Sequence, residues 1–258
     1  MLDWNPALYR RYEDERTRPA IELLARVPLE APRRVVDLGC GPGNSTELLA
    51  ARFPGADIVG IDNSRAMLES ARKRLPAVRF EFDDIHDWEP ESAPDLIYAN
   101  AALQWVPDHE TLIPRLFDKL QPGGVLAIQM PDNRAEPTHR LMREVAAEAA
   151  FSAAIGDADK LRTELLSIDG YYDLLAGNAA TVDVWRTAYQ HPMASAAAIV
   201  EWVRGTGLKP FVDRLAPGLQ QDFLAEYERR VDAAYPSRAD GRRLLAFPRM
   251  FIVAGRKA

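Results

Sequence analysis

The sequence is almost without cysteine, since Cys40 is the only one among 258 residues and no intrachain disulfide can form. Its four histidines, His86, His109, His139 and His191, show none of the spacings used by zinc sites, and we expect them to be helix caps or surface residues. These features predict that the chain has no metal site. They also favour a reducing compartment, for which the cytoplasm fits best.

The chain also lacks long apolar runs and an excess of positive charge. No apolar stretch could span a bilayer, and the first residues have neither the apolar core nor the cleavage site of a signal peptide. Lys and Arg number 32 against 38 Asp and Glu, which gives a formal net charge of −6. Such a molecule repels nucleic acid and anionic membranes, so we expect neither as a partner. The oligomeric state is left open.

What the sequence does have is a regular alternation of short apolar strands and helical segments in its first half. The predicted strands are 34–38, 57–62, 78–82, 95–100 and 125–130, and the predicted helices are 19–26, 44–53, 64–75 and 109–120. Strands and helices that alternate in this way form right-handed βαβ crossovers. The pattern therefore predicts an α/β, Rossmann-like fold with a mostly parallel sheet and covered faces.

The second half departs from this alternation. It contains a predicted helix at 136–151, a strand at 181–190, a mainly helical stretch at 194–235 and a last strand at 248–255. We predict a single domain over 1–258, with a cofactor-binding core at about 30–133. A helical insertion at about 191–245 would then form a substrate cap.

A glycine-rich turn follows the first predicted strand and opens a helix. Gly39, Gly41 and Gly43 allow the backbone to turn sharply and a ligand to approach the main chain. The spacing is Gly-x-Gly-x-Gly, whereas dinucleotide sites use Gly-x-Gly-x-x-Gly, and Asn44 stands where their third glycine would be. Asp37 would be unfavourable beside a phosphate but suits the ammonium group of an amino-acid moiety.

Two further aspartates end the next two predicted strands. Asp62 can accept hydrogen bonds from both ribose hydroxyls, as the acid after the second strand does in dinucleotide sites. Asp84 can accept from an adenine amine while Ile85 packs near the ring. Together with Asp37, these residues describe a site for an adenosine that carries a cationic amino acid.

These features resemble the class I S-adenosylmethionine-dependent methyltransferases, whose fold is a seven-stranded sheet with an antiparallel last strand. The resemblance covers essentially the whole chain. It implies S-adenosylmethionine as cofactor and S-adenosylhomocysteine as product. Carried over residue by residue, it implies a cofactor site made of Asp37, Gly39, Gly41, Gly43, Asn44, Asp62, Asn63, Asp84, Ile85 and Asn100, with Asn100 beneath the reactive sulfonium.

A narrower likeness within that family runs from the first residues to the last. It is carried by residues 3–6, 18–20, 27–30, 37–45, 103–105, 107–109, 129–133, 136–139 and 246–249. It implies methyl esterification of a carboxylate on a small tricarboxylic acid. A carboxylate is already an anion at neutral pH, so this reaction needs in-line placement and no obligatory general base.

A polycarboxylate substrate needs fixed positive charge and hydrogen-bond donors, and arginine pairs best with carboxylates. The candidate substrate-binding residues are Trp4, Tyr9, Gln129, Lys209 and Arg249, with Arg16 and Arg18 as further basic candidates. Asn100, Gln104 and Trp105 are predicted to position the reactants.

Three alternatives stay open at this point. The chain could methylate another small-molecule oxygen or nitrogen nucleophile, although that chemistry often needs a base that the sequence does not offer. It could be an NAD-dependent oxidoreductase, against which the glycine spacing and Asp37 argue. It could also be a regulator that binds the cofactor without catalysis.

Overall fold

The structure is a computed structural model that describes residues 13–161 and 163–258. The described residues fall into two compact units. The first unit holds the described residues up to Pro131 together with Leu165–Arg186 and Met250–Ala258, and the second unit holds the described residues of 132–164 and Thr187–Arg249.

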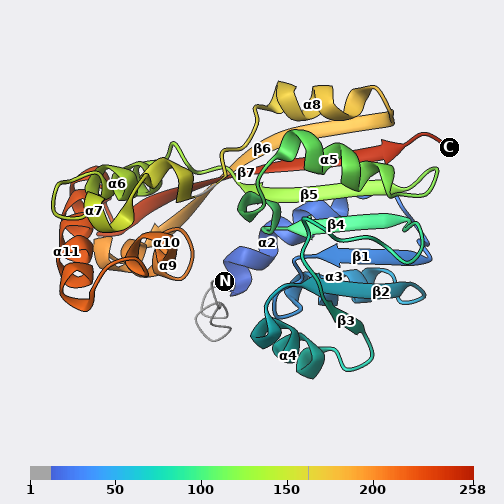
Figure 1. The fold of residues 1–258 in the computed structure, drawn as a ribbon, viewed down its shortest axis with the longest axis horizontal. Helices are drawn as coiled ribbons and strands as arrows, with labels where there is room; N and C mark the ends of the chain where they lie inside the picture. Colours follow the sequence, from blue (N-terminus) through green and yellow to red (C-terminus); the bar gives the residue numbers. More distant parts are fainter. Residues whose placement is uncertain (1–12, 162) are drawn as a thin grey trace. The chain divides into compact units, whose positions relative to one another are not determined.

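A seven-stranded sheet organises the first unit (Figure 1). Its strands are β1 (Arg34–Leu38), β2 (Asp57–Asp62), β3 (Arg79–Phe82), β4 (Leu96–Asn100), β5 (Val125–Pro131), β6 (Ala179–Met193) and β7 (Arg243–Arg256), and the last two continue into the second unit. The order across the sheet is β3-β2-β1-β4-β5-β7-β6. The first five strands pair in parallel, so their carboxyl ends meet at one edge.

β7 runs antiparallel to β5. The Arg256 N–H donates to the Gly124 carbonyl at 2.8 Å, and the Gly123 N–H donates to the Lys257 carbonyl at 3.3 Å. Residue numbers therefore fall along one strand as they rise along the other, which is the antiparallel register. The predicted mostly parallel sheet with an antiparallel last strand is confirmed.

Helices cover the sheet of the first unit on both faces (Figure 1). They are α2 (Glu13–Ala25), α3 (Asn44–Arg52), α4 (Arg65–Arg74), α5 (His109–Asp118), α8 (Ile168–Ala176) and the short η1 (Leu103–Trp105). α2 packs against α3 and β5, while α5 packs against β5 and α8. The core between α5, α8 and the sheet contains large apolar side chains such as Phe117 and Ile128. This packing fixes the strand ends that carry the predicted site.

The second unit is mainly helical. It contains α6 (Pro137–Ala146), α7 (Ser152–Ile155), η2 (Ala158–Leu161), α9 (Ala196–Arg204), α10 (Lys209–Val212) and α11 (Pro217–Ala234). α11 packs against α6 and α9, and Tyr227 Oη donates to the Thr138 carbonyl at 3.1 Å. The predicted insertion at 191–245 lies within this unit, which also takes in residues 132–164. That the whole chain acts as one domain stays a prediction.

Several segments differ from the sequence-based expectation. α2 begins at Glu13, ahead of the predicted helix at 19–26, and β7 begins at Arg243, ahead of the predicted strand at 248–255. The predicted helix at 136–151 is too long, because α6 ends at Ala146, and the separate helix α7 starts at Ser152, just beyond the predicted range. α8 was not predicted, although the Ser167 side chain caps it by accepting from the Gly170 N–H at 3.1 Å. Gly170 and a pair of tyrosines lower the intrinsic helix preference of this segment, and its burial against α5 compensates.

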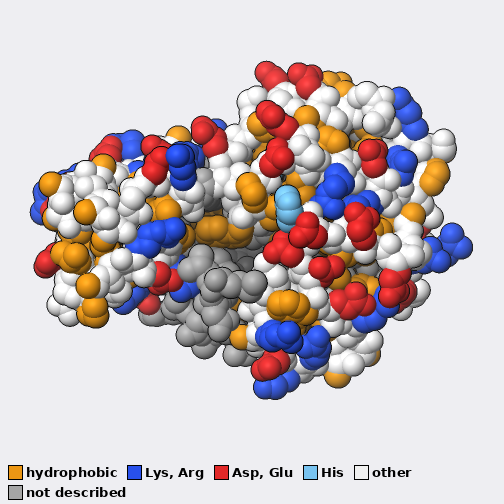
Figure 2. Space-filling view, viewed as in Figure 1, with side chains coloured by type: hydrophobic (Ala, Val, Ile, Leu, Met, Phe, Trp, Pro, Cys, Tyr) orange, Lys and Arg blue, Asp and Glu red, His pale blue; other side chains and the backbone are white. Residues whose placement is uncertain are grey.

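No helix among the described residues is long and apolar enough to cross a membrane. On the face drawn in Figure 2, acidic and basic side chains are intermixed over the first unit and form no continuous basic stripe. This agrees with the negative formal charge of the chain.

Candidate active site at the carboxyl edge of the sheet

The glycine-rich turn connects β1 to α3 through three left-handed residues. Gly39, Gly41 and Gly43 have φ values of 70°, 55° and 91°. A β-carbon on Gly39 would lie 2.3 Å from Ala102 Cβ, whereas one on Gly41 would meet no atom of the described residues within 4 Å. Gly39 is therefore required by close packing against the protein. The open space at Gly41 leaves room for a ligand beside the main chain.

The turn is tied to β2 by its own N–H groups. Gly39 and Cys40 both donate to the Ile61 carbonyl, at 2.8 and 3.0 Å. The Gly41 N–H donates to Asp62 Oδ2 at 2.9 Å. These donors are thus used within the protein, and the main contribution of the glycines to a ligand is access.

Asp37 is fully buried at the end of β1. Its Oδ2 accepts from the hydroxyls of Ser45 and Thr46, at 2.7 and 2.6 Å, in the first turn of α3. Its Oδ1 is buried and accepts no hydrogen bond from the described residues. Burial raises the pKa of Asp37 from 3.8 to about 6, although the two hydroxyls oppose the shift. A cationic ligand group would satisfy the second oxygen and stabilise the ionised form.

Asp62 ends β2 and connects two backbone segments. In addition to the Gly41 bond, its Oδ1 accepts from the Ser64 N–H at 2.8 Å. Desolvation raises the pKa of this carboxyl above its usual value, and the two backbone donors limit the rise. Each oxygen has accepting capacity beyond these bonds, so the predicted ribose role is chemically feasible.

The predicted adenine residues follow β3. Asn63 Nδ2 donates to Asp84 Oδ2 at 3.0 Å, and the His86 N–H donates to Asp84 Oδ1 at 2.9 Å. The Ile85 Cδ1 atom lies 3.5 Å from the point that a β-carbon on Gly39 would occupy. The structure thus brings Asp84, Asn63 and Ile85 together beside the glycine turn.

A strained elbow at 100–104 follows β4. Ala101 has φ of 54°, a left-handed conformation that is uncommon for a residue other than glycine. Its N–H donates to the Gln129 carbonyl at 2.8 Å, and its carbonyl accepts from Gln104 Nε2 at 2.6 Å. Strain of this kind persists where surrounding contacts determine it, and it is common at functional sites.

The elbow presents two acceptor atoms. Because the Ala101 carbonyl can only accept, the Gln104 amide nitrogen must face it, which leaves Oε1 on the other side. Gln104 Oε1 and Asn100 Oδ1 are both buried and have no hydrogen-bond partner among the described residues. Like Asp37 Oδ1, these atoms require donors, and a bound ligand could supply them.

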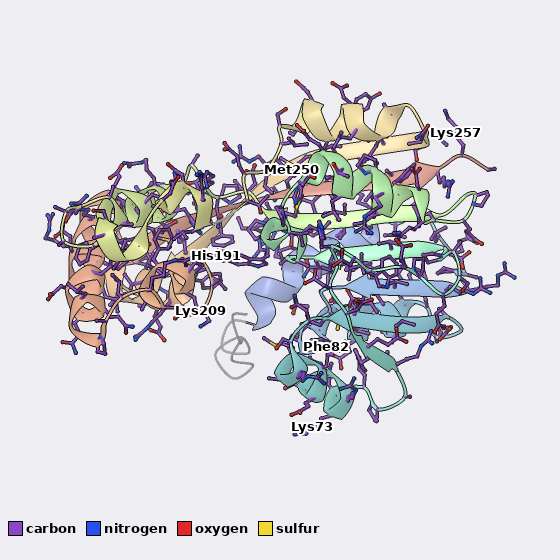
Figure 3. The ribbon with its side chains drawn as sticks, viewed as in Figure 1. Lys73, Phe82, His191, Lys209, Met250 and Lys257 are labelled. Atoms are coloured by element: carbon purple, nitrogen blue, oxygen red, sulfur yellow. The ribbon has the colours of Figure 1, made fainter. Side chains whose placement is uncertain are left out.

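The predicted substrate residues are distributed over both units. Gln129 is fully buried in β5 and Trp105 is half-buried in η1, both in the first unit. Lys209, labelled in Figure 3, belongs to the second unit. It forms an ion pair with Asp213 at 2.6 Å. Arg249, also in the second unit, is 4% exposed, and its guanidinium lies 4.9 Å from the centre of the Phe247 ring.

Some basic and aromatic candidates cannot be placed in the site. Trp4 and Tyr9 lie outside the described residues, and nothing is described of the Arg16 side chain. Arg18 forms an exposed ion pair with Glu22 at 2.9 Å. These substrate-binding assignments stay predictions.

Two histidines that were expected to be helix caps or surface residues are buried instead. His109 is 3% exposed and bonds to Tyr171, and His139 is 6% exposed and packs 6.3 Å from the Phe247 ring. Their neighbours come from segments distant in the chain, so local spacing could not show this burial. Among the described residues, no group of three or more His, Cys, Asp or Glu could hold a metal ion.

Sequence reasoning missed the hydroxyls that hold Asp37. Ser45 and Thr46 stand at the start of the predicted helix, where such residues commonly cap, so this position was the available signal. In the structure they hold the aspartate instead of capping the helix.

Comparisons with known sequences agree with this geometry. A family model described as a methyltransferase domain matches residues 9–211. A trans-aconitate 2-methyltransferase from Variovorax paradoxus (strain S110) is 78% identical over 259 residues, which covers 100% of both chains. Another from Yersinia pseudotuberculosis serotype O:1b (strain IP 31758) is 56% identical, with 98% of each chain covered.

Solved structures share the fold at low identity. The YcgJ protein from Bacillus subtilis matches with a TM-score of 0.61 at 13% identity, over 93% of this chain and 99% of its own. Phosphoethanolamine N-methyltransferase 2 from Haemonchus contortus, in complex with phosphomonomethylethanolamine and S-adenosylhomocysteine, matches with a TM-score of 0.55 at 17% identity. That match covers 93% of this chain and 53% of the other. The predicted class I fold is confirmed.

Proposed function

Because the chain belongs to the trans-aconitate 2-methyltransferase family, we propose that it transfers a methyl group from S-adenosylmethionine to a carboxylate of trans-aconitate. The observation that carries this proposal is the 78% identity over the full length of a relative with that name. The reaction is an O-methylation that yields a methyl ester and S-adenosylhomocysteine.

The residues at the sheet edge fit the cofactor. Asp37 Oδ1 and Asn100 Oδ1 are buried acceptors with no partner among the described residues, as a site for an ammonium group requires. Asp62 would hold the ribose, and Asp84 with Ile85 would hold the adenine. The space beside Gly41 would let the amino-acid moiety pass close to the main chain.

The bound cofactor supplies an electrophilic methyl group on a sulfonium, and the protein has to present a carboxylate oxygen to it in line. A carboxylate with a pKa near 4 is ionised at neutral pH, so no side chain needs to remove a proton. Positioning of this kind can lower a barrier by ~7–11 kcal/mol. Burial of the 100–104 elbow excludes water from the acceptor atoms that would hold the reactants.

A substrate with three carboxylates needs cationic partners. We assign Arg249 as the main candidate, because its guanidinium is buried and already lies against the Phe247 ring. Lys209 is a weaker candidate, since its side chain is 25% exposed whereas Arg249 is 4% exposed. Arg249→Gln should raise the KM for trans-aconitate at least tenfold, and Lys209→Gln should change it less. An unchanged KM in Arg249→Gln would remove that residue from the substrate site.

The test is transfer of labelled methyl from S-adenosylmethionine to trans-aconitate, with a panel of other di- and tricarboxylates as competitors. We expect transfer to trans-aconitate and a base-labile methyl ester as product. No label above background, with cofactor binding shown by calorimetry, would leave methylation of another oxygen or nitrogen nucleophile as the better assignment. Loss of cofactor binding as well would refute the methyltransferase assignment.

The other expectations about partners remain proposals of the same kind. We expect a small polycarboxylate as the partner, neither nucleic acid nor membrane, and a cytoplasmic location. The cytoplasmic location rests on the single cysteine.

A further inference from the structure

His109 connects the strained elbow to a distant helix. It is the first residue of α5 and is 3% exposed. Its Nε2 lies 2.9 Å from the carbonyl oxygen of Leu103, which belongs to the elbow. Its Nδ1 lies 2.6 Å from the hydroxyl of Tyr171 in α8. Each nitrogen of this imidazole thus lies within hydrogen-bond distance of a different segment.

The partners determine which nitrogen carries the proton. The Leu103 carbonyl can only accept, so Nε2 must be the protonated nitrogen of a neutral ring. Nδ1 is then an acceptor, and the Tyr171 hydroxyl donates a hydrogen bond to it. The buried site lowers the pKa of His109, which favours this neutral form. All the hydrogen bonds therefore point in one direction, toward the elbow.

Tyr171 is itself fixed. Its side chain is fully buried in the core of the first unit, and its oxygen accepts from the Leu166 N–H at 3.4 Å. Its ring lies 5.9 Å from the His109 ring. Leu166, Tyr171, His109 and Leu103 therefore form a chain of hydrogen bonds within the first unit.

The elbow needs such support. Ala101 is in a strained conformation. Its N–H donates to the Gln129 carbonyl, and its carbonyl accepts from Gln104, which is itself part of the elbow. The bond from His109 to Leu103 adds an attachment on the other side of Ala101, next to Gln104. Gln104 Oε1 and Asn100 Oδ1 keep their places only while the backbone between them keeps its conformation.

We propose that His109 and Tyr171 are positioning residues for the methyl transfer, which hold the 100–104 elbow so that Asn100 and Gln104 face the reactants. The proposal rests on the proposed function for its kinetic part. Neither residue touches a reacting atom. Their effect passes through the Leu103 carbonyl.

Two substitutions of His109 separate positioning from packing. Glutamine can place its amide nitrogen near the position of Nε2 and so keep the donor to Leu103, whereas asparagine reaches only the position of Nδ1. We expect His109→Asn to lower kcat by about tenfold or more, with KM values within about threefold. His109→Gln should retain kcat within about threefold. A 1 Å displacement can cost this much in rate.

Tyr171→Phe provides a milder variant, since it removes one hydroxyl and keeps the ring. Its matched control is Tyr172→Phe, at the next residue of α8, where the side chain is 50% exposed. We expect Tyr171→Phe to lower kcat severalfold while Tyr172→Phe equals the wild type. If His109→Asn fails to fold, this pair carries the test.

Hydrogen–deuterium exchange of residues 98–106 gives a readout that needs no substrate. We expect exchange there to quicken in His109→Asn and Tyr171→Phe, and to stay near the wild-type rate in His109→Gln and Tyr172→Phe. Wild-type exchange in both of the first two variants would overturn the proposal, as would equal losses of kcat in His109→Gln and His109→Asn. A wild-type enzyme inactive on trans-aconitate would instead refute the proposed function, and exchange would still decide the role of His109.

Discussion

At the scale of single residues, the candidate site is marked by buried acceptor atoms that have no hydrogen-bond donor among the described residues. Asp37 Oδ1, Asn100 Oδ1 and Gln104 Oε1 all belong to this set. An unmet buried acceptor costs about 1–3 kcal/mol, so three of them in the residues around one strand edge require a compensating role. Donor groups on a ligand would offset that cost, so ligand binding should stabilise the carboxyl edge of the sheet.

The pH dependence of cofactor affinity follows from Asp37. A cationic partner favours the carboxylate, while burial favours the acid and raises the pKa to about 6. With a pKa of about 6, the ionised fraction of Asp37 rises from about one tenth at pH 5 to about nine tenths at pH 7, so affinity for S-adenosylhomocysteine should rise about tenfold over that range. Calorimetry across that range is the measurement. The Asp37→Asn variant should bind weakly with no such pH dependence, and a wild type with flat affinity would contradict the prediction.

The same shift acts on stability. Between pH 4 and pH 6 the unfolded chain has ionised this group while the folded protein still holds the proton. The folded state therefore binds more protons, and stability falls by about 3 kcal/mol from this residue as pH rises through the window. Denaturant unfolding of wild type and Asp37→Asn at pH 4 and pH 7 would show the difference in slope.

Asp62→Ala should weaken cofactor affinity by ~1.5–3 kcal/mol, because a charged acceptor for the ribose hydroxyls is lost. The variant also loses the bonds to the N–H groups of Gly41 and Ser64, so its melting temperature should fall. Asp57→Ala is a suitable control, since Asp57 lies at the opposite end of β2 with an exposed side chain. Equal affinity of the two variants in calorimetry would exclude Asp62 from the site.

At the scale of elements, the glycine turn makes two separable contributions. Gly39→Ala would put a β-carbon 2.3 Å from Ala102 Cβ at a φ of 70°, and we expect it to lower the free energy of unfolding by several kcal/mol. The new methyl group of Gly41→Ala meets none of the described residues within 4 Å, so this variant should cost only about 1 kcal/mol, from its left-handed φ.

The affinity for the cofactor should rank Gly39→Ala and Gly41→Ala in a different order from their stability. Among folded molecules, Gly41→Ala should lose affinity, because its methyl group would enter the space proposed for the ligand. Chemical denaturation and calorimetry on both variants give the two rankings. A Gly41→Ala protein with wild-type affinity would show that the space is not used by the cofactor.

Elements were predicted well where the determining signal is local. β1 and β2 have the predicted bounds, since each is an apolar, β-branched run bounded by glycine or proline. The aspartates at strand ends were found for the same reason. α8 was not predicted, because its stability comes from packing against α5. The His109–Tyr171 contact was hidden for a related reason, since it joins two elements far apart in the chain.

At the scale of the whole molecule, the residues proposed to bind the cofactor all belong to the first unit. Saturating S-adenosylhomocysteine should therefore slow hydrogen exchange at residues 37–45, 60–64, 83–86 and 100–104 while leaving α11 unchanged. At a ligand concentration of 100 Kd the added stability is about 2.7 kcal/mol, which an upward shift in melting temperature would show. Protection centred on α11 would contradict the assignment of the site.

The position of β7 between β5 and β6 has a consequence for the order of folding. Its partner strands both precede it in the chain, and the second unit's segments separate β5 from β7. Until β7 inserts, β5 presents an open edge to other chains, and closing so long a loop is slow. The last step of assembly is thus predicted to be strand insertion, and the refolding yield should fall as protein concentration rises.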